Sequence, residues 1–220
     1  MLGIVRVLTT DDENILMEHG KRMKELYHIA SKTKCIGEQP NGIYDNESEA
    51  EAIPKIISLA KELSQERDID AITISCAADP ALDEARLETD IPIIGAGVSG
   101  AHAASMVGSK VGIIGITKEP PVRMKKELGS RFHAYTSSSK LSKTTDLFKA
   151  NAKQELLTLV HQQMESGADV ILFACTGFST IRLKDYLQKR VKIPVIDLVE
   201  AQAIAYQLIE TREKDEEENV

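Results

Sequence analysis

The chain of 220 residues carries one pattern twice, and this repetition restricts its fold more than any other feature. An apolar segment runs into a cysteine at 72–77 (Ile-Thr-Ile-Ser-Cys-Ala) and again at 171–176 (Ile-Leu-Phe-Ala-Cys-Thr). Each is followed by a helix-like stretch and then by Ile-Pro-(Ile/Val)-Ile, at 91–94 and 193–196. The two cysteines are 99 residues apart and the two prolines 102, so the units differ by a three-residue insertion. We therefore expect two similar halves.

Apolar runs alternate with amphipathic stretches along the chain, which is typical of parallel sheets covered by helices. The predicted strands span 3–8, 33–37, 71–75, 92–95, 111–116, 131–135, 170–174 and 193–196. The predicted helices span 11–30, 47–66, 80–88, 98–107, 119–128, 146–166, 178–189 and 198–212. The pattern predicts an α/β protein of two pseudo-symmetric lobes, each a four-stranded, mainly parallel sheet flanked by helices. The active site is expected in the cleft between the lobes.

The opening strand also recurs, because the segment 3–9 matches 112–117 as a strand that begins with glycine and ends in threonine. The first lobe is therefore expected at 1–107 and the second at 108–220, with a charged, flexible tail at 213–220. In open parallel sheets, ligands bind outside the carboxyl ends of the strands. Both cysteines and several threonines lie at such ends.

Composition excludes several classes of function. The net charge of −7 disfavours a nucleic-acid partner, because phosphate contacts need clustered Lys and Arg. No apolar run approaches the ~18 residues of a membrane span, so no membrane association is expected. The three cysteines lack the spacing of a zinc site and are too few for a disulfide framework, so neither a metal nor a disulfide is expected. A reducing cytoplasm is the expected compartment.

The repeated cysteines, Cys76 and Cys175, are candidates for proton transfer. A thiolate is a base, and the free-cysteine pKa of about 8.5 falls beside a helix N-terminus. Asp79 is the expected N-cap of the helix after Cys76, with Pro80 in its first position. The small residues after Cys175 leave backbone N–H groups that are expected to face a ligand carbonyl. Two thiols on opposite sides of one cleft can invert a carbon without a metal or an organic cofactor.

The residues around these cysteines resemble the aspartate/glutamate/hydantoin racemase superfamily, and within it the hydantoin racemase-like branch. The resemblance covers nearly the whole chain. Its most specific segments are 75–83 (Ser-Cys-Ala-Ala-Asp-Pro-Ala-Leu-Asp), 91–95, 174–177 (Ala-Cys-Thr-Gly) and 193–197. The amino-acid racemases of the superfamily typically carry Cys-Asn-Thr at the first cysteine, where this chain has Cys-Ala-Ala, which disfavours free aspartate or glutamate as substrate.

The resemblance implies that Cys76 and Cys175 are the two acid/base residues, that a small molecule of hydantoin type is the substrate, and that the chain forms a homo-oligomer. By position it also implies a set of pocket-lining residues: Thr9, Thr10, Gly42, Ile43, Ala77, Thr117, Thr176 and Gly177. The chain departs from the branch at the end of its first strand, where hydantoin racemases usually carry Asn-Pro-Asn. Leu-Thr-Thr stands there instead, so the substrate pocket is expected to be altered.

Other interpretations stay open. The chain is alternatively a related cofactor-free isomerase or decarboxylase that uses one cysteine, or a two-lobed ligand-binding protein whose cysteines only pack. Cys35 has no counterpart in the second half and is expected to be a small buried hydrophobe. The glycine-rich segment 95–100 is expected to pack a strand against a helix, with Ser99 as the cap, rather than to bind a nucleotide. The polar run 135–143 is expected to be a mobile connection and a candidate lid.

Overall fold

The computed structural model describes residues 1–209 and shows two four-stranded sheets, one in each half of the chain. The strands of the first are β1 (Leu2–Arg6), β2 (Ser31–Cys35), β3 (Ala71–Ser75) and β4 (Ile93–Gly95), in the order β2-β1-β3-β4. The second is formed by β5 (Val111–Gly115), β6 (Phe132–Ser137), β7 (Val170–Phe173) and β8 (Val195–Ile196), in the order β6-β5-β7-β8. Every pairing is parallel and the two orders are equivalent. The predicted fold class is confirmed.

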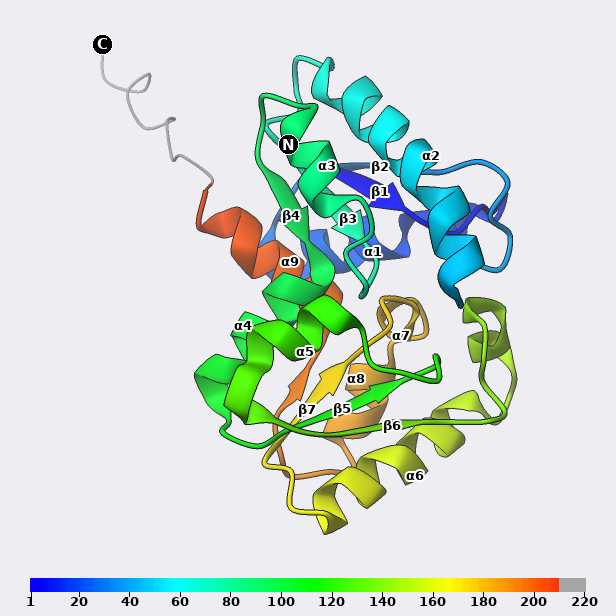
Figure 1. Ribbon diagram of the computed structural model, residues 1–220, viewed down its shortest axis with the longest axis vertical. Helices are drawn as coiled ribbons and strands as arrows, with labels where there is room; N and C mark the ends of the chain where they lie inside the picture. Colours follow the sequence, from blue (N-terminus) through cyan, green and yellow to red (C-terminus); the bar gives the residue numbers. More distant parts are fainter. Residues whose placement is uncertain (210–220) are drawn as a thin grey trace.

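Helices alternate with these strands (Figure 1). They are α1 (Glu13–Tyr27), α2 (Asn46–Ser64), α3 (Leu82–Leu87), α4 (Ala96–Val107), α5 (Val122–Leu128), α6 (Ala152–Glu165), α7 (Gly177–Thr180), α8 (Leu183–Gln188) and α9 (Leu198–Gln207), with short 3-10 turns η1 (Gly129–Arg131) and η2 (Thr144–Phe148). The single helix predicted at 178–189 is wrong, because Arg182 takes left-handed backbone angles and separates α7 from α8. The helix predicted from 146 begins only at Ala152, after η2.

Helix α2 also begins differently from the prediction. Its N-cap is Asp45. The Asp45 carboxylate accepts a hydrogen bond of 2.9 Å from the Ser48 backbone N–H, and the Ser48 hydroxyl lies 3.1 Å from the Asp45 N–H. This reciprocal pair satisfies donors that a helix N-terminus otherwise leaves open, and so the helix begins one residue earlier than expected.

The last helix of each half packs on the other half. Helix α4 follows the first sheet, but Ala101 and Ala104 belong to the core of the second sheet. Helix α9 follows the second sheet, while Val199, Ala203 and Tyr206 pack with Leu2 and Ile4 of the first. Figure 1 shows the orange α9 beside the strands of the upper half and the green α4 with the lower half.

The exchanged helices also contact each other. A side-chain carbon added at Gly100 of α4 would overlap the end of the Leu198 side chain of α9, so the glycine leaves room for this leucine. This pair joins the two sheets into one structure. The lobe boundary at 107/108, which the sequence repeat predicts, therefore stays a prediction. The last residues of the helix predicted at 198–212, and the tail at 213–220, lie outside the described residues.

None of the helices within residues 1–209 has the length and apolar character needed to cross a membrane.

Candidate active site

Cys76 directly follows β3, and Cys175 comes two positions after the last residue of β7. These two strands are the equivalent inner strands of the two sheets. Both line one cavity of about 1170 Å³, which also has wall residues from α2, α3 and α5. Cys76 is 9% exposed and Cys175 is partly buried. The repeat thus brings its two thiols to the same space from opposite halves of the chain.

The two thiols differ in acidity. Burial raises the pKa of Cys76 far above its ordinary value, the Ala78 N–H acts against this, and Cys175, Asp79 and Glu49 raise it further. Burial also raises the pKa of Cys175, to about 11, but the Gly177 and Phe178 N–H groups and the charge of Arg6 lower it. Cys175 is therefore the more acidic thiol, and both are protonated at neutral pH in the ligand-free site.

The loop after Cys76 is held by a contact that differs from the predicted one. Asp79 does not cap the helix that follows it: α3 begins at Leu82 with no side-chain cap, and Pro80 precedes it. Asp79 instead accepts hydrogen bonds from the N–H groups of Gly97 (2.8 Å) and Val98 (2.7 Å) in the first turn of α4. Burial nevertheless raises its pKa to about 6. The carboxylate thus ties the Cys76 loop to α4.

The glycine-rich segment at 95–100 serves this contact. A side-chain carbon added at Gly97 would lie under 3.0 Å from both the Ala77 carbonyl oxygen and the Asp79 carboxylate. The predicted role in close packing therefore fits the observed contacts. Ser99 is not the cap, however, because Gly95 takes that position and the Ser99 hydroxyl donates to the Gly95 carbonyl (2.7 Å).

The loop after Cys175 is fixed to the first half. The Thr176 hydroxyl donates a hydrogen bond of 3.0 Å to the carbonyl of Ser75, the residue before Cys76. The N–H groups of Gly177 and Phe178, which were expected to face a ligand, act on the Cys175 sulfur itself. These contacts hold the two cysteine loops in a defined relation.

The structure brings together six of the ten predicted site residues on the cavity wall: Cys76, Cys175, Ile43, Ala77, Thr117 and Thr176. The other four predicted residues do not line the cavity. The Thr9 hydroxyl donates to the Ile36 carbonyl (2.6 Å), and the Thr10 hydroxyl accepts from the Asp12 N–H (3.1 Å). Gly42, in the left-handed region, packs against Thr144, and the Gly177 N–H faces the Cys175 sulfur. The functional roles of all ten stay predictions.

The polar run 135–143 is only partly a connection. Its first three residues belong to β6. The remainder leads into η2, and Ser142 before it and Thr144 at its start line the cavity. There the Lys143 ammonium lies 4.9 Å from the centre of the Tyr44 ring, so the two halves touch across this end of the cavity. A lid function stays a prediction.

A buried polar cluster behind the cysteines was missed from the sequence. Arg6, 3% exposed, donates to the carbonyls of Ile15 and Leu16 (2.7 and 2.9 Å). The two ring nitrogens of His19 lie 2.8 Å from the Ser75 hydroxyl and 3.0 Å from the Thr180 hydroxyl. Burial and then the charge of Arg6 hold the pKa of His19 well below its usual range, so the ring is neutral. The sequence feature that could have indicated this cluster is Arg6, a charged residue at the end of an apolar strand.

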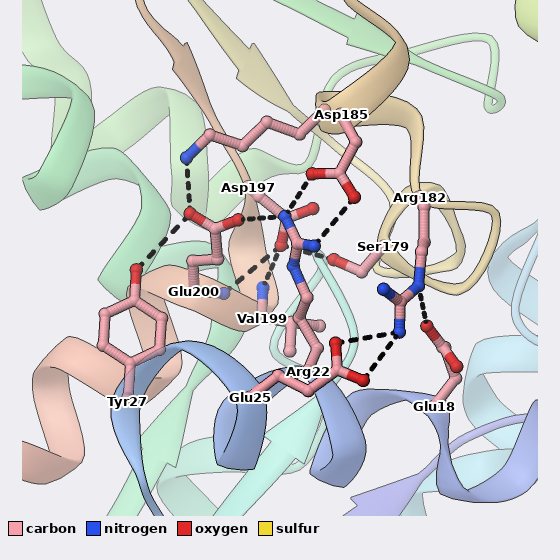
Figure 2. A network of polar contacts seen from close by, with 11 residues as sticks. Glu18, Arg22, Glu25, Tyr27, Ser179, Arg182, Asp185, Asp197, Val199 and Glu200 are labelled. Carbon is pink, nitrogen blue, oxygen red and sulfur yellow. Dashed lines mark hydrogen bonds and ion pairs between the residues drawn. The ribbon is translucent and has the colours of Figure 1, made fainter. Parts of the chain in front are cut away.

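A second network joins the halves beside this cluster (Figure 2). Arg22 of α1 donates to Asp185 of α8 (2.6 and 2.9 Å) and to Glu200 of α9 (2.8 Å). Arg182 binds Glu18 (2.6 Å). Because α1 belongs to the first half and its partners to the second, these ion pairs fasten the halves near the Cys175 loop.

Within residues 1–209, no group of three or more His, Cys, Asp or Glu side chains is arranged to hold a metal ion.

Comparison with known proteins identifies the family. The model of the family described as Asp/Glu/Hydantoin racemase matches residues 35–205. The chain belongs to this family. Two hydantoin racemases are each 28% identical to it: one from Pseudomonas sp. (strain NS671) over 160 residues, 68% of this chain and 61% of the relative, and one from Paenarthrobacter aurescens over 163 residues, 70% and 66%. The match therefore spans less than two thirds of either relative.

A solved structure shows the family fold. Allantoin racemase from Klebsiella pneumoniae superimposes with a TM-score of 0.80, over 94% of this chain and 86% of that protein, at 18% identity. At this identity the likeness concerns the fold alone. The family model confirms the predicted membership in the Asp/Glu/hydantoin racemase superfamily, and the two hydantoin racemases support the predicted branch.

Proposed function

We propose that the chain is a cofactor-independent racemase that inverts a carbon next to a carbonyl group, with a hydantoin-type ring as its preferred substrate. The observation that carries the proposal is the pair of thiols, Cys76 and Cys175, at equivalent ends of β3 and β7 in the wall of one cavity. Family membership supports the reaction class, and the hydantoin racemases among the relatives support the substrate class.

The difference in acidity assigns the roles. Cys175 ionises before Cys76, because two backbone N–H groups and Arg6 favour its thiolate. The Cys175 thiolate removes the proton from one face of the substrate carbon, and the bond electrons pass to the adjacent carbonyl. The Cys76 thiol donates its proton to the opposite face and becomes the thiolate. The other enantiomer reacts with the roles exchanged, and neither direction changes the oxidation state of the substrate.

Deuterium incorporation at ring carbon 5 of single hydantoin enantiomers tests the proposal. The wild type is expected to incorporate deuterium from both enantiomers and to interconvert them. Cys76→Ser and Cys175→Ser should each abolish interconversion, because a hydroxyl is a much weaker acid and base partner than a thiol. Cys35→Ser, the matched control outside the cavity, should retain the activity. If neither enantiomer exchanges with the wild type, the proposal is wrong.

Two alternatives make different predictions. A decarboxylase that uses one cysteine would release carbon dioxide from a malonate-type diacid and would survive one of the two serine substitutions. A ligand-binding protein would bind hydantoin without exchanging its proton. Alkylation with iodoacetamide distinguishes the ligand-binding protein from the enzyme. Alkylation of Cys175 that a bound ligand prevents supports catalysis. A homo-oligomeric state and a cytoplasmic location stay predictions.

A further inference from the structure

The cavity wall is acidic. Eight carboxyl groups and three basic side chains line it, so the wall has a formal charge of −5. Most of the less exposed carboxylates already have partners. Asp79 accepts two backbone N–H groups, and the partly buried Glu127 lies 3.4 Å from the His102 ring. The exposed Asp83 pairs with Arg123. These groups therefore have limited capacity to bind a ligand.

Glu49 is the exception. It lies in the first turn of α2 and lines the cavity, and it is half-buried. Among residues 1–209 no hydrogen bond or ion pair involves its carboxylate, whereas the other wall carboxylates without partners, Glu47, Glu84 and Glu119, are exposed to water. A partly desolvated carboxylate without a donor is unfavourable until a donor arrives. Burial raises the pKa of Glu49, as expected for such a group.

Glu49 is also close to the chemistry. Its charge is one of those that raise the pKa of Cys76, after burial and after the charges of Cys175 and Asp79. Glu49 and both thiols line the same cavity, so a substrate held between the thiols shares that cavity with this carboxylate. The group beside the reacting carbon in a hydantoin ring is an N–H, which a carboxylate binds. A diacid or a ring-opened N-carbamoyl amino acid carries a carboxylate and no cation, so Glu49 repels it.

We propose that Glu49 determines the substrate class: its carboxylate accepts a hydrogen bond from a ring N–H of a neutral cyclic ureide or amide and rejects substrates that carry a free carboxylate. The identity of the reaction rests on the function proposed above, but the binding preference does not. The negative wall adds to this selection, because it lowers the local concentration of anions.

Isothermal calorimetry on the full chain tests the binding preference. The ligands are 5-methylhydantoin, its derivatives methylated at ring nitrogen 1 or at ring nitrogen 3, and N-carbamoylalanine as the ring-opened anion. The wild type should bind 5-methylhydantoin about tenfold more tightly than one of the two methylated derivatives, which lacks the charge-assisted hydrogen bond. Glu49→Gln should bind 5-methylhydantoin about tenfold more weakly and should bind the anion more tightly than the wild type does.

A double-substitution cycle makes the contact specific. If Glu49 holds a ring N–H, methylation of that nitrogen and Glu49→Gln remove the same interaction, so their combined effect is no larger than either alone. Glu51→Gln, on the same helix but outside the cavity, removes an equal charge and should leave all affinities within about twofold. Thermal unfolding of Glu49→Gln checks that the variant folds.

The outcomes separate the two proposals. Glu49-dependent binding without deuterium exchange would refute the racemase and keep the role of Glu49. If Glu49→Gln exchanges deuterium and binds all ligands with unchanged affinities, the role of Glu49 is refuted and the racemase is kept. The same conclusion follows if the effects of Glu49→Gln and of methylation on the affinity are additive at both ring nitrogens. If the wild type neither binds nor exchanges any of these ligands, both are wrong.

Discussion

Two opposing effects act on Asp79, and the stability of an Asn variant decides which is larger. The carboxylate accepts two short backbone N–H bonds, which favour its charged form, but it is 3% exposed, which disfavours that form. Burial is the larger effect and raises the pKa from 3.8 to about 6. Between these two pH values the folded state holds a proton that the unfolded chain has released. The stability of the wild type therefore falls as the pH rises through this window.

The size of the effect follows from the two pKa values. A difference of about 2.2 pH units corresponds to about 3 kcal/mol in the free energy of unfolding. About 1 kcal/mol of this is already lost at pH ~4.5, and nearly all of it at pH ~7.5. Asp79→Asn does not titrate, so its free energy of unfolding relative to the wild type should rise by about 2 kcal/mol between those pH values.

Urea denaturation at a series of pH values and constant ionic strength measures this difference. The slope of free energy against urea should be equal in both proteins, so the midpoints report stability directly. Asp90→Asn, at an exposed position where residues 1–209 offer it no hydrogen bond or ion pair, is the control for the same substitution at the surface. A difference for Asp79→Asn that falls with pH would show that the N–H bonds outweigh burial and hold the pKa below 3.8, which refutes the reasoning.

Two further substitutions test the contacts that join the halves. Arg22→Met removes the arginine from the buried Glu200, which keeps Lys184 as a partner, and should lower the free energy of unfolding by about 1–3 kcal/mol in urea denaturation. The exposed Arg67→Met should change it by less than about 0.5 kcal/mol. Gly97→Ala forces the Cys76 loop away from α4, so it should lower the free energy of unfolding by about 1–3 kcal/mol and reduce the proposed racemase activity. Gly37→Ala, with open space around it, should affect neither, and equal effects of the two substitutions would contradict the close packing.

The strands and the overall architecture were predictable because they depend on local patterns. Parallel strands buried on both faces are continuous apolar runs, and the strand predicted at 71–75 matches β3 to the residue. The helix ends were less predictable. Asp45 caps α2, but Asn46 and Ser48 are equally good capping residues, and local preference does not discriminate between the three.

Contacts between distant segments were beyond the sequence pattern. An Asp-Pro pair after a strand indicates a local helix start, and only the tertiary structure shows that Asp79 binds the N-terminus of α4 instead. An apolar face on α9 likewise predicts burial but does not say which sheet it covers. For the site, the repeat located both cysteines, while Glu49 could not be separated from the other acidic residues of 47–51, since exposure alone distinguishes it.

The duplicated fold yields an unequal pair of thiols because the two halves differ at equivalent positions. Arg6 ends β1, and the equivalent position of β5 is Gly115, where the Tyr135 side chain fills the space. A positive charge thus favours the thiolate of Cys175, whereas negative groups surround Cys76. This inequality cannot favour one enantiomer at equilibrium, because mirror-image molecules have equal free energies. The ratio kcat/KM must therefore be equal in the two directions, and the electrostatic difference appears only as compensating differences in kcat and in KM.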